Sequence, residues 1–335
     1  MKHPSRLLSI FVLALLILFG GCIVEYNPNA GLPQGDQLQK LTWTPDGMKV
    51  IVQTDSFAGS AYMQRIRLFD QSAALVQSFD VPIGVAFQGD IWPTADDSTI
   101  FASIYTGSLY TVSRYFLASG SRTAIAGGAV YGESVDHRHL FIGPSGYQSQ
   151  SGKYLVVDAG SEKPRLESSW LDVAPSQYTT GAWIGASNLG YFRYNSFNLV
   201  DFVITDSLGT KLDSFDVSFL TQYYNTQAFH GPGALYITGR DGVLKYDSAS
   251  RTHSFLTTDN ISQADISPDG SFIVYAAGLS TYTLTVLNTK TGATKQLASN
   301  YVVYPKISPS GDHLAYIDKS GTSGGKLVVM PISAP

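Results

Sequence analysis

The sequence predicts an all-β protein, a β-propeller of four-stranded blades. Ser-Pro-Asp-Gly or a near copy of it occurs at Thr44–Gly47, Ser267–Gly270 and Ser308–Gly311, each time between two apolar runs. A second motif, an apolar run that ends in Asp or Asn before a polar turn, recurs along the same stretch. The composition agrees, because 14% charged residues with 32 Gly and 20 Tyr favour strands and turns over helices. Two motifs with one shared period indicate an array of repeated units.

The spacing of the units predicts their number. The first apolar residue of the second strand in each unit falls at Val50, Ile100, Leu140, Leu189, Leu235, Phe272 and Leu314. The mean interval is about 44 residues, the length of a four-stranded propeller blade. Seven blades fit this period, the first over 39–83 and the later ones beginning near 88, 130, 177, 223, 261 and 302. Six or eight blades, or a generic β-sandwich, are the alternatives.

The third strand of a unit is predicted to end at an Asp or Asn, because these side chains accept hydrogen bonds from the backbone two residues on and start a turn. The positions are Asp70, Asp158, Asp206, Asp247 and Asn288. The last unit lacks a clear fourth strand after 327–332. Since a ring needs closure to avoid an exposed edge, we expect the segment around 35–40 to supply that strand.

The N-terminus predicts an export signal. Lys2, His3 and Arg6 precede a largely apolar run over 7–19, too short to span a bilayer comfortably and suited to a signal-peptide core. Gly20 and Gly21 then lead to Cys22, the single cysteine of the chain. An ordinary secretory signal or an uncleaved anchor is the alternative.

This arrangement resembles a bacterial lipoprotein signal, in which the cysteine is lipidated. The resemblance implies a signal peptide over 1–21, lipidation of Cys22, a flexible tether over 22–38 and a propeller over 39–335. Ile23 in the place of an Asp implies the outer membrane in a Gram-negative cell. Two or three acyl chains would hold the protein at the membrane.

The blades resemble the TolB-type, or WD40-like, propeller repeat family, in which Ser-Pro-Asp-Gly opens the first hairpin. The resemblance covers about 39–335 and is sharp at the three motifs named above. The corresponding segments at 93–97 and 135–139 keep only polar turn character. The resemblance implies the fold of the family and no particular member of it.

Motifs for chemistry are sparse. The mature chain is mildly acidic, with 20 basic and 26 acidic residues and no basic run, which argues against nucleic acid as a partner. His137 and His139 could face one side of a strand, but His230 and His313 fall in other blades, so we expect no metal site. The sequence contains no nucleophile elbow, no zinc-protease motif and no phosphate-binding glycine loop. No cofactor and no catalytic residue are therefore predicted.

Tyrosines mark one predicted rim. Loops between blades and loops between second and third strands share one face of a propeller, and ten tyrosines fall in or beside them. They are Tyr62, Tyr105, Tyr131, Tyr147, Tyr178, Tyr194, Tyr223, Tyr224, Tyr282 and Tyr301. Tyrosine is enriched at recognition surfaces because it offers rigid contact area and a hydroxyl. Packing between blades is the other explanation for these rings.

The sequence therefore predicts a lipid-anchored propeller of the cell envelope that binds an envelope protein through a tyrosine-rich face and is not an enzyme. One alternative is an envelope enzyme, similar to a lactonase or a glycan lyase, with its site in the propeller funnel. Another is a structural surface lipoprotein without a specific ligand.

Overall fold

A computed structural model describes most of the chain from Gly35 onward. The described residues are 35–58, 61–81, 86–105, 110–133, 139–143, 154–158, 164–168, 182–183, 188–194, 200–206, 210–217, 227–231, 234–247, 249–278, 282–299, 301–321 and 324–332. The predicted signal peptide, Cys22 and most of the predicted tether lie outside them.

The described residues form seven antiparallel sheets of consecutive strands, and no helix. We number the sheets 1 to 7 along the chain. Sheet 1 holds β1 (Gly35–Trp43), β2 (Lys49–Ala58), β3 (Ala61–Asp70) and β4 (Leu75–Asp80), and sheet 2 holds β5 (Ala86–Pro93), β6 (Thr99–Tyr105), β7 (Tyr110–Phe116) and β8 (Arg122–Gly127). Sheet 3 holds β9 (Ala129–Glu133), β10 (His139–Gly143), β11 (Tyr154–Asp158) and β12 (Pro164–Ser168), and sheet 4 holds β13 (Ala182–Trp183), β14 (Asn188–Tyr194), β15 (Val200–Asp206) and β16 (Lys211–Asp216).

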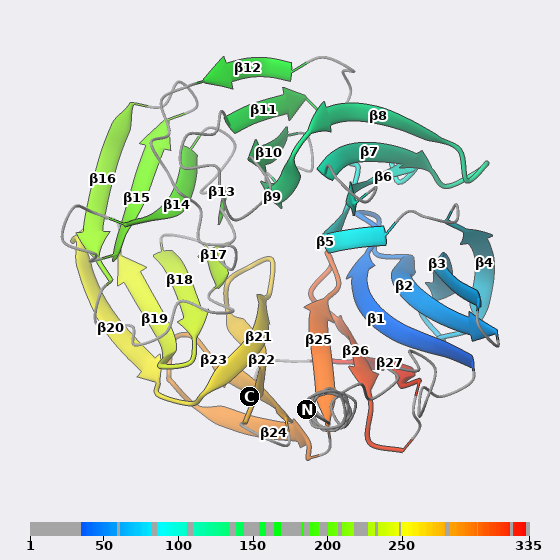
Figure 1. Cartoon of the computed structure of the whole chain (residues 1–335). Coiled ribbons are helices and arrows are strands. Elements are labelled where there is room, and N and C mark those ends of the chain that lie inside the picture. The colour runs from blue at the N-terminus through cyan, green and yellow to red at the C-terminus, as the bar shows by residue number, and fades with distance from the viewer. Residues whose placement is uncertain are drawn as a thin grey trace, which may run out of the picture.

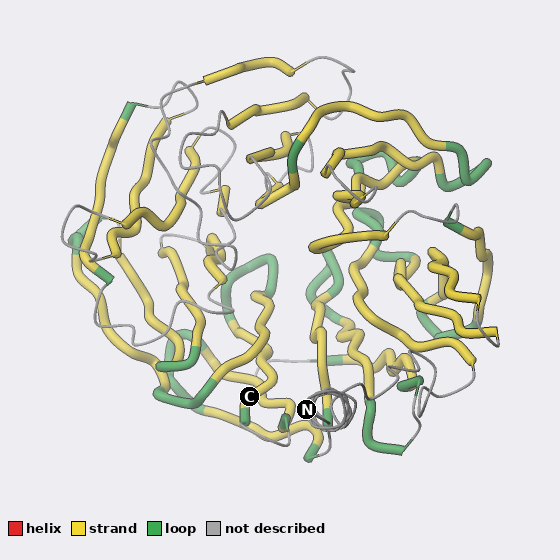
Figure 2. The backbone as a smooth tube through the Cα atoms, viewed as in Figure 1, coloured by secondary structure: helices red, strands yellow, loops and turns green. Residues whose placement is uncertain are grey.

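Sheet 5 holds β17 (Gln227–Gly231), β18 (Ala234–Gly239), β19 (Gly242–Asp247) and β20 (Thr252–Thr257), and sheet 6 holds β21 (Ile261–Ile266), β22 (Phe272–Ala277), β23 (Thr283–Asn288) and β24 (Thr294–Ala298). Sheet 7 holds the three strands β25 (Val302–Ile307), β26 (His313–Asp318) and β27 (Lys326–Pro331). The first strand of each sheet lies toward the centre of a ring and the last toward its circumference (Figure 1). The chain is therefore a β-propeller, as the sequence predicts, and strands make up most of its described backbone (Figure 2).

The turn between the first and second strands explains the Ser-Pro-Asp-Gly motif. In sheet 6 the hydroxyl of Ser267 donates to Asp269 Oδ1 at 2.7 Å and accepts from the backbone N–H of Phe272 at 3.1 Å. Gly270 has a φ of 67°, a conformation that glycine adopts without steric cost. The motif is therefore a self-contained turn in which two side chains satisfy backbone and side-chain donors.

Sheet 2 has the same turn without the glycine. Thr94 donates to Asp96 Oδ1 at 2.5 Å, and its hydroxyl accepts from the N–H of Thr99. Asp97 takes the place of the glycine, with a φ of 56°, because Asp tolerates the left-handed region better than most residues do. The sequence predicts only polar turn character for residues 93–97, and the structure shows that the complete hydrogen-bonded turn of the motif is present there.

The turns at the ends of the third strands confirm the predicted role of Asp and Asn. Asp70 Oδ1 accepts from the N–H groups of Ser72 and Ala74, both at 2.9 Å. Asn288 Oδ1 accepts from the N–H groups of Lys290 and Thr291, both at 3.0 Å. Asp206 and Asp247 act in the same way. Each turn leads the chain outward to the fourth strand of its sheet.

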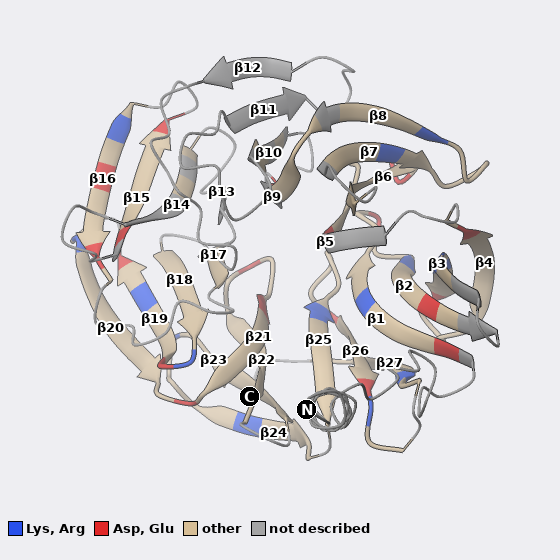
Figure 3. Cartoon of the chain, in the orientation of Figure 1, with Lys and Arg blue, Asp and Glu red and all other residues tan. Residues whose placement is uncertain are grey.

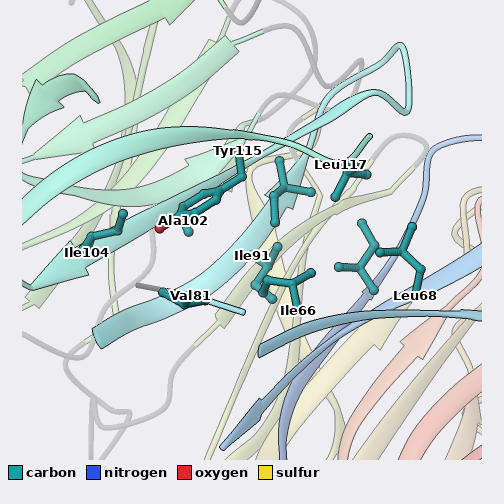
Figure 4. Packing of buried hydrophobic residues seen from close by; sticks show 10 residues of the cluster. Ile66, Leu68, Val81, Ile91, Ala102, Ile104, Tyr115 and Leu117 are labelled. Atoms are coloured by element: carbon teal, nitrogen blue, oxygen red, sulfur yellow. The ribbon is translucent and has the colours of Figure 1, made fainter. Parts of the chain in front are cut away.

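The core lies between neighbouring sheets. One face of sheet 1 and one face of sheet 2 meet in a cluster that includes Ile66, Leu68, Ile91, Ile104 and Tyr115, all buried (Figure 4). Similar clusters join sheets 2 and 3, 4 and 5, 5 and 6, 6 and 7, and 7 and 1. Stability is thus distributed around the ring, because each described sheet buries apolar side chains against at least one neighbour.

The predicted closure of the ring is wrong. Residues 35–40 do not add to sheet 7, because they belong to β1, which pairs with β2 as the innermost strand of sheet 1. Sheets 7 and 1 instead meet through packing, with Leu41, Trp43 and Val50 against Ala315 and Ile317. The indole N–H of Trp43 also donates to the carbonyl oxygen of Lys306 at 2.9 Å. Side-chain packing and hydrogen bonds, including one from Leu38 N–H to the carbonyl oxygen of Gly324 at 2.8 Å, therefore join the two ends of the described chain.

Candidate functional site

The connections between strands fall on two faces of the ring. On one, which we call the turn face, lie the connections from first to second and from third to fourth strands; Thr289 Oγ1, for example, donates to the carbonyl oxygen of Gly270 at 2.6 Å. On the other, which we call the loop face, lie the second-to-third connections and those between sheets. There the N–H of Gly278 donates to the carbonyl oxygen of Asn260 at 3.0 Å. Five of the tyrosines singled out in the sequence, Tyr62, Tyr105, Tyr194, Tyr282 and Tyr301, lie at or beside strand ends on the loop face.

The structure places six of the ten tyrosines. Tyr105 and Tyr194 are the last residues of β6 and β14, Tyr62 is the second residue of β3, and Tyr131 lies at the middle of β9. Tyr282 and Tyr301 precede β23 and β25. The other four, Tyr147, Tyr178, Tyr223 and Tyr224, lie outside the described residues.

Tyr282 and Tyr301 come together where sheets 6 and 7 meet. Their ring centroids are 5.3 Å apart at an interplanar angle of 42°, within the range of favourable aromatic pairs. The backbone of each tyrosine accepts one hydrogen bond. Val302 N–H donates to the carbonyl oxygen of Tyr282 at 3.2 Å, and Lys319 N–H donates to that of Tyr301 at 2.8 Å. Tyr301 still exposes 39% of its surface. The pair is thus a solvent-accessible aromatic feature on a rigid support.

Polar side chains of the inner strands connect neighbouring sheets. Gln227 of β17 accepts the N–H of Ala264 in β21 at 2.9 Å, and Gln263 of β21 accepts the N–H of Tyr304 in β25. One edge of an inner strand faces the centre of the ring and pairs with no strand of its own sheet. The backbone N–H groups on that edge therefore need other hydrogen-bond partners. These glutamines provide them, and they fix sheet 5 to sheet 6 and sheet 6 to sheet 7.

Asp265 makes the same kind of connection with a carboxylate. Its Oδ2 accepts the N–H of Ile307 at 2.7 Å, and its Oδ1 lies 3.9 Å from the ammonium of Lys306. Burial raises the pKa of Asp265, against the opposing effects of Lys306 and of the backbone donors. This carboxylate therefore holds β21 against β25, although burial makes its charged form less favourable.

A charged pair and an unusual tyrosine lie between sheets 1, 2 and 7. Lys40 Nζ of β1 is 3.5 Å from Asp90 Oδ1 of β5. Burial raises the pKa of the Tyr304 hydroxyl to about 12, and the negative charge of Asp90 adds to this effect. Tyr304 has a φ of 54° at a bulge in β25, a strained conformation for an aromatic residue that the surrounding contacts must maintain. Charges are otherwise sparse and scattered around the ring (Figure 3).

Sequence reasoning missed this set of inner-strand residues, although the repeat contains a signal for it. Lys40, Gln227 and Gln263 occupy one register position, each opposite the fifth residue of the second strand in its own sheet. A polar residue at the same place in several units indicates a repeated structural task. Alignment of the inner strands by this register would have revealed it.

The described histidines are spread over three sheets, and His253 of β20 shares sheet 5 with His230. His139, His230 and His313 belong to β10, β17 and β26, and His137 lies outside the described residues. Among the residues that the structure describes, no group of three or more His, Cys, Asp or Glu side chains could hold a metal ion. In the same part of the chain no helix is long and apolar enough to cross a membrane.

Known structures resemble the chain in fold. No protein-family model matches it, and no curated protein matches it by sequence. The β-propeller domain of the Trilobed protease from Pyrococcus furiosus, described as having an open velcro topology, matches 90% of this chain and 98% of its own with a TM-score of 0.65 at 11% identity. An oligogalacturonate lyase in complex with manganese matches 90% of both chains with a TM-score of 0.60 at 15% identity.

The acylaminoacyl peptidase from Pyrococcus horikoshii matches 88% of this chain and 51% of its own, with a TM-score of 0.62 at 12% identity. At these identities the likeness is one of fold alone. Enzymes and a protease domain share the architecture, so a function has to be argued from this chain's own residues.

Proposed function

We propose that this protein is a lipid-anchored propeller of the cell envelope that binds a protein partner through its loop face. The observation that carries the proposal is the Tyr282–Tyr301 pair. The two rings are partly exposed, and the backbone of each tyrosine is held by a hydrogen bond. Binding of a partner would therefore cost little conformational entropy in the backbone that carries the rings. Lipidation of Cys22 and a place in the outer membrane belong to the proposal and rest on the sequence resemblance.

The inner strands support a binding role over a catalytic one. Two carboxylates described there have structural partners: Asp36 contacts Arg65 and Arg67 within sheet 1, and Asp265 of sheet 6 contacts Ile307 N–H of sheet 7. A catalytic carboxylate has to be within reach of a substrate and change its protonation during reaction. Groups that fix one sheet to the next are poorly placed to do so, because their release would loosen the ring.

Site-specific photo-crosslinking tests the binding proposal. A photo-reactive phenylalanine analogue replaces Tyr301 in the lipidated full-length protein, and irradiation follows in intact cells. Phe116 is the matched control, an aromatic residue of similar exposure (36%) at the turn-face end of β7. We expect a discrete crosslinked protein from position 301 and none from position 116, and loss of that product when Tyr282 is changed to Ala in the same chain. Equal labelling from both positions would refute a specific loop-face partner and favour a structural lipoprotein without a ligand.

A second candidate function, an envelope enzyme with its site in the funnel, is favoured by one observation. The Lys40–Asp90 pair adjoins Tyr304, a residue with a strained backbone, and such strain is common at active sites. Soaking crystals with small acidic sugars, a substrate class suggested by the lyase of similar fold, tests it. Density between Lys40 and Tyr304 would support the enzyme, and an empty funnel at saturating sugar would argue against it.

A further inference from the structure

Lys319 lies directly beside the exposed tyrosine of the loop face. It follows the last residue of β26, and its backbone N–H donates to the carbonyl oxygen of Tyr301 at 2.8 Å. One position earlier, Asp318 pairs with Val302. Lys319 and Tyr301 therefore stand opposite each other where β26 ends and β25 begins, and side chains at such positions lie on the same face. The side chain of Lys319 thus starts next to the Tyr282–Tyr301 pair.

The backbone and the stem of Lys319 are held in place. Asp318 Oδ1 accepts from the N–H of Ser320 at 2.8 Å and from its hydroxyl at 2.5 Å, which closes the turn that carries Lys319. A Cβ on Gly325 would lie 3.3 Å from the Cγ of Lys319, so the stem packs against the backbone of the same connection. A lysine held in this way loses less conformational entropy on binding than a fully exposed one.

The ammonium of Lys319 forms neither an ion pair nor a hydrogen bond in the part of the chain that the structure describes. Asp55 is the carboxylate whose charge acts on it, but Asp55 already accepts the side-chain N–H of Gln64 at 3.0 Å. The lysine is half-buried, and burial lowers the pKa of Lys319 against the opposing effect of Asp55. The fold has thus removed part of the water around a cation without supplying a hydrogen-bonded anion.

The charge of Lys319 matches a ligand with a single negative charge. One ammonium balances one carboxylate, whereas a phosphate dianion would also meet repulsion from Asp55. A carboxylate that approaches from the loop face meets a lysine whose water is already partly removed, so the attraction is stronger than between two exposed groups. Tyr301, which exposes 39% of its surface, offers contact area to the residue that flanks the carboxylate.

We propose that the partner bound at the Tyr282–Tyr301 pair presents an acidic peptide segment. In it, a carboxylate pairs with the ammonium of Lys319, and an adjacent aromatic or apolar side chain packs on Tyr301. This inference rests on the loop-face binding proposed above and specifies its chemistry. The tyrosines supply contact area and Lys319 selects the charge, because a basic segment would bring a second cation beside the first. Lys319 is therefore a specificity-determining residue of the loop face.

Binding of synthetic copolymers to the full-length protein tests this chemistry. A fluorescent Glu–Tyr copolymer carries carboxylates and aromatic rings, poly-Glu carries carboxylates alone, and a Lys–Tyr copolymer carries the opposite charge. We expect the Glu–Tyr copolymer to bind most tightly. Lys319→Met keeps an apolar stem of similar length and removes the ammonium, so it should weaken this binding at least about tenfold.

Lys326→Met is the matched control, because Lys326 is an exposed lysine at the start of β27, in the same part of sheet 7. It should leave the affinity for the Glu–Tyr copolymer within about twofold of the unmodified protein. Equal binding by the two variants would overturn the proposal. Equal affinity of the unmodified protein for the Glu–Tyr and Lys–Tyr copolymers would overturn it as well.

Thermal unfolding separates recognition from a role in stability. Lys319→Met removes a half-buried charge that has no ion pair among the described residues, so we expect its Tm to equal or exceed that of the unmodified protein. A clearly lower Tm would show that the ammonium stabilises the fold through Asp55 and would overturn the proposal.

Photo-crosslinking from position 301 distinguishes failure of this inference from failure of the proposed function. We expect Lys319→Glu in the same chain to abolish the crosslinked protein and Lys326→Glu to keep it. A product that persists with Lys319→Glu would leave the loop-face partner standing and overturn its acidic chemistry. A crosslink to lipid in place of protein, or none at all with Lys319 intact, would overturn the loop-face partner and this inference with it.

Discussion

Gly324 is a position where the two ends of the described ring lie in close contact. A methyl group there would lie 2.2 Å from the carbonyl oxygen of Asp36, far inside van der Waals contact, and its neighbour is backbone that cannot rotate away. Gly324→Ala should therefore push β1 away from the loop before β27 and weaken the hydrogen bond from Leu38 N–H to the Gly324 carbonyl oxygen. The seam between sheets 7 and 1 is the part of the molecule at risk.

The cost follows from two contributions. Overpacking against a rigid neighbour costs about 1–3 kcal/mol, and loss of a partly buried hydrogen bond adds about 1 kcal/mol. We expect the free energy of unfolding to fall by about 2–4 kcal/mol, which lowers the Tm of a protein of this size by several degrees.

Gly321→Ala is the matched control in the same connection, because a Cβ on Gly321 meets nothing within 4 Å. Denaturant unfolding followed by tryptophan fluorescence measures both variants, and Trp43 at the seam reports on it directly. A Gly324→Ala protein as stable as the Gly321→Ala protein would refute packing between β1 and the loop before β27 as the closure.

Two carboxylates, those of Asp97 and Asp265, should make the free energy of unfolding fall as pH rises, the opposite of the effect of a carboxylate whose pKa is lowered by folding. Burial, with the neighbouring charges of Asp46 and Asp96, raises the pKa of Asp97, so stability contributed by its protonated form is lost as pH rises through that pKa. Asp97→Asn keeps the left-handed turn and an acceptor for Asp46 N–H, and should raise stability at neutral pH by about 0.5 kcal/mol; no change in a pH series of melting temperatures would contradict this. Burial also raises the pKa of Asp265, so the wild-type protein should lose stability as pH rises from mildly acidic to neutral. The Asp265→Asn variant should lose less stability over the same pH range. Asp265→Ala should cost about 2–3 kcal/mol, because Ile307 N–H loses its partner, and equal stability of the two Asp265 variants would refute the bridging role.

Local motifs were predictable because their hydrogen bonds close within a few residues. The Ser267–Gly270 turn and the Asn288 turn depend on side chains two to five positions from their backbone partners, so the sequence pattern contains the whole interaction. The same reasoning placed the inner strands near 88, 130, 177, 223, 261 and 302, and the structure begins them at 86, 129, 182, 227, 261 and 302. The full turn at Thr94–Asp97 was not predicted, because Asp97 stands where the motif has Gly. Both residues can adopt the left-handed conformation that the turn requires.

The sequence alone thus determined the repeat, its period and the class of fold, because each unit specifies its own turns and its own alternation of apolar residues. The tertiary structure decided how the units join. Gln263 accepts a hydrogen bond from Tyr304 N–H, 41 residues away, and Trp43 donates to the carbonyl oxygen of Lys306, 263 residues away. Such contacts form when the ring brings strands that are distant in the sequence side by side. A local sequence pattern does not indicate which distant residues will then be in contact. For the same reason the Tyr282–Tyr301 pair became visible in three dimensions, although both tyrosines were already marked in the sequence.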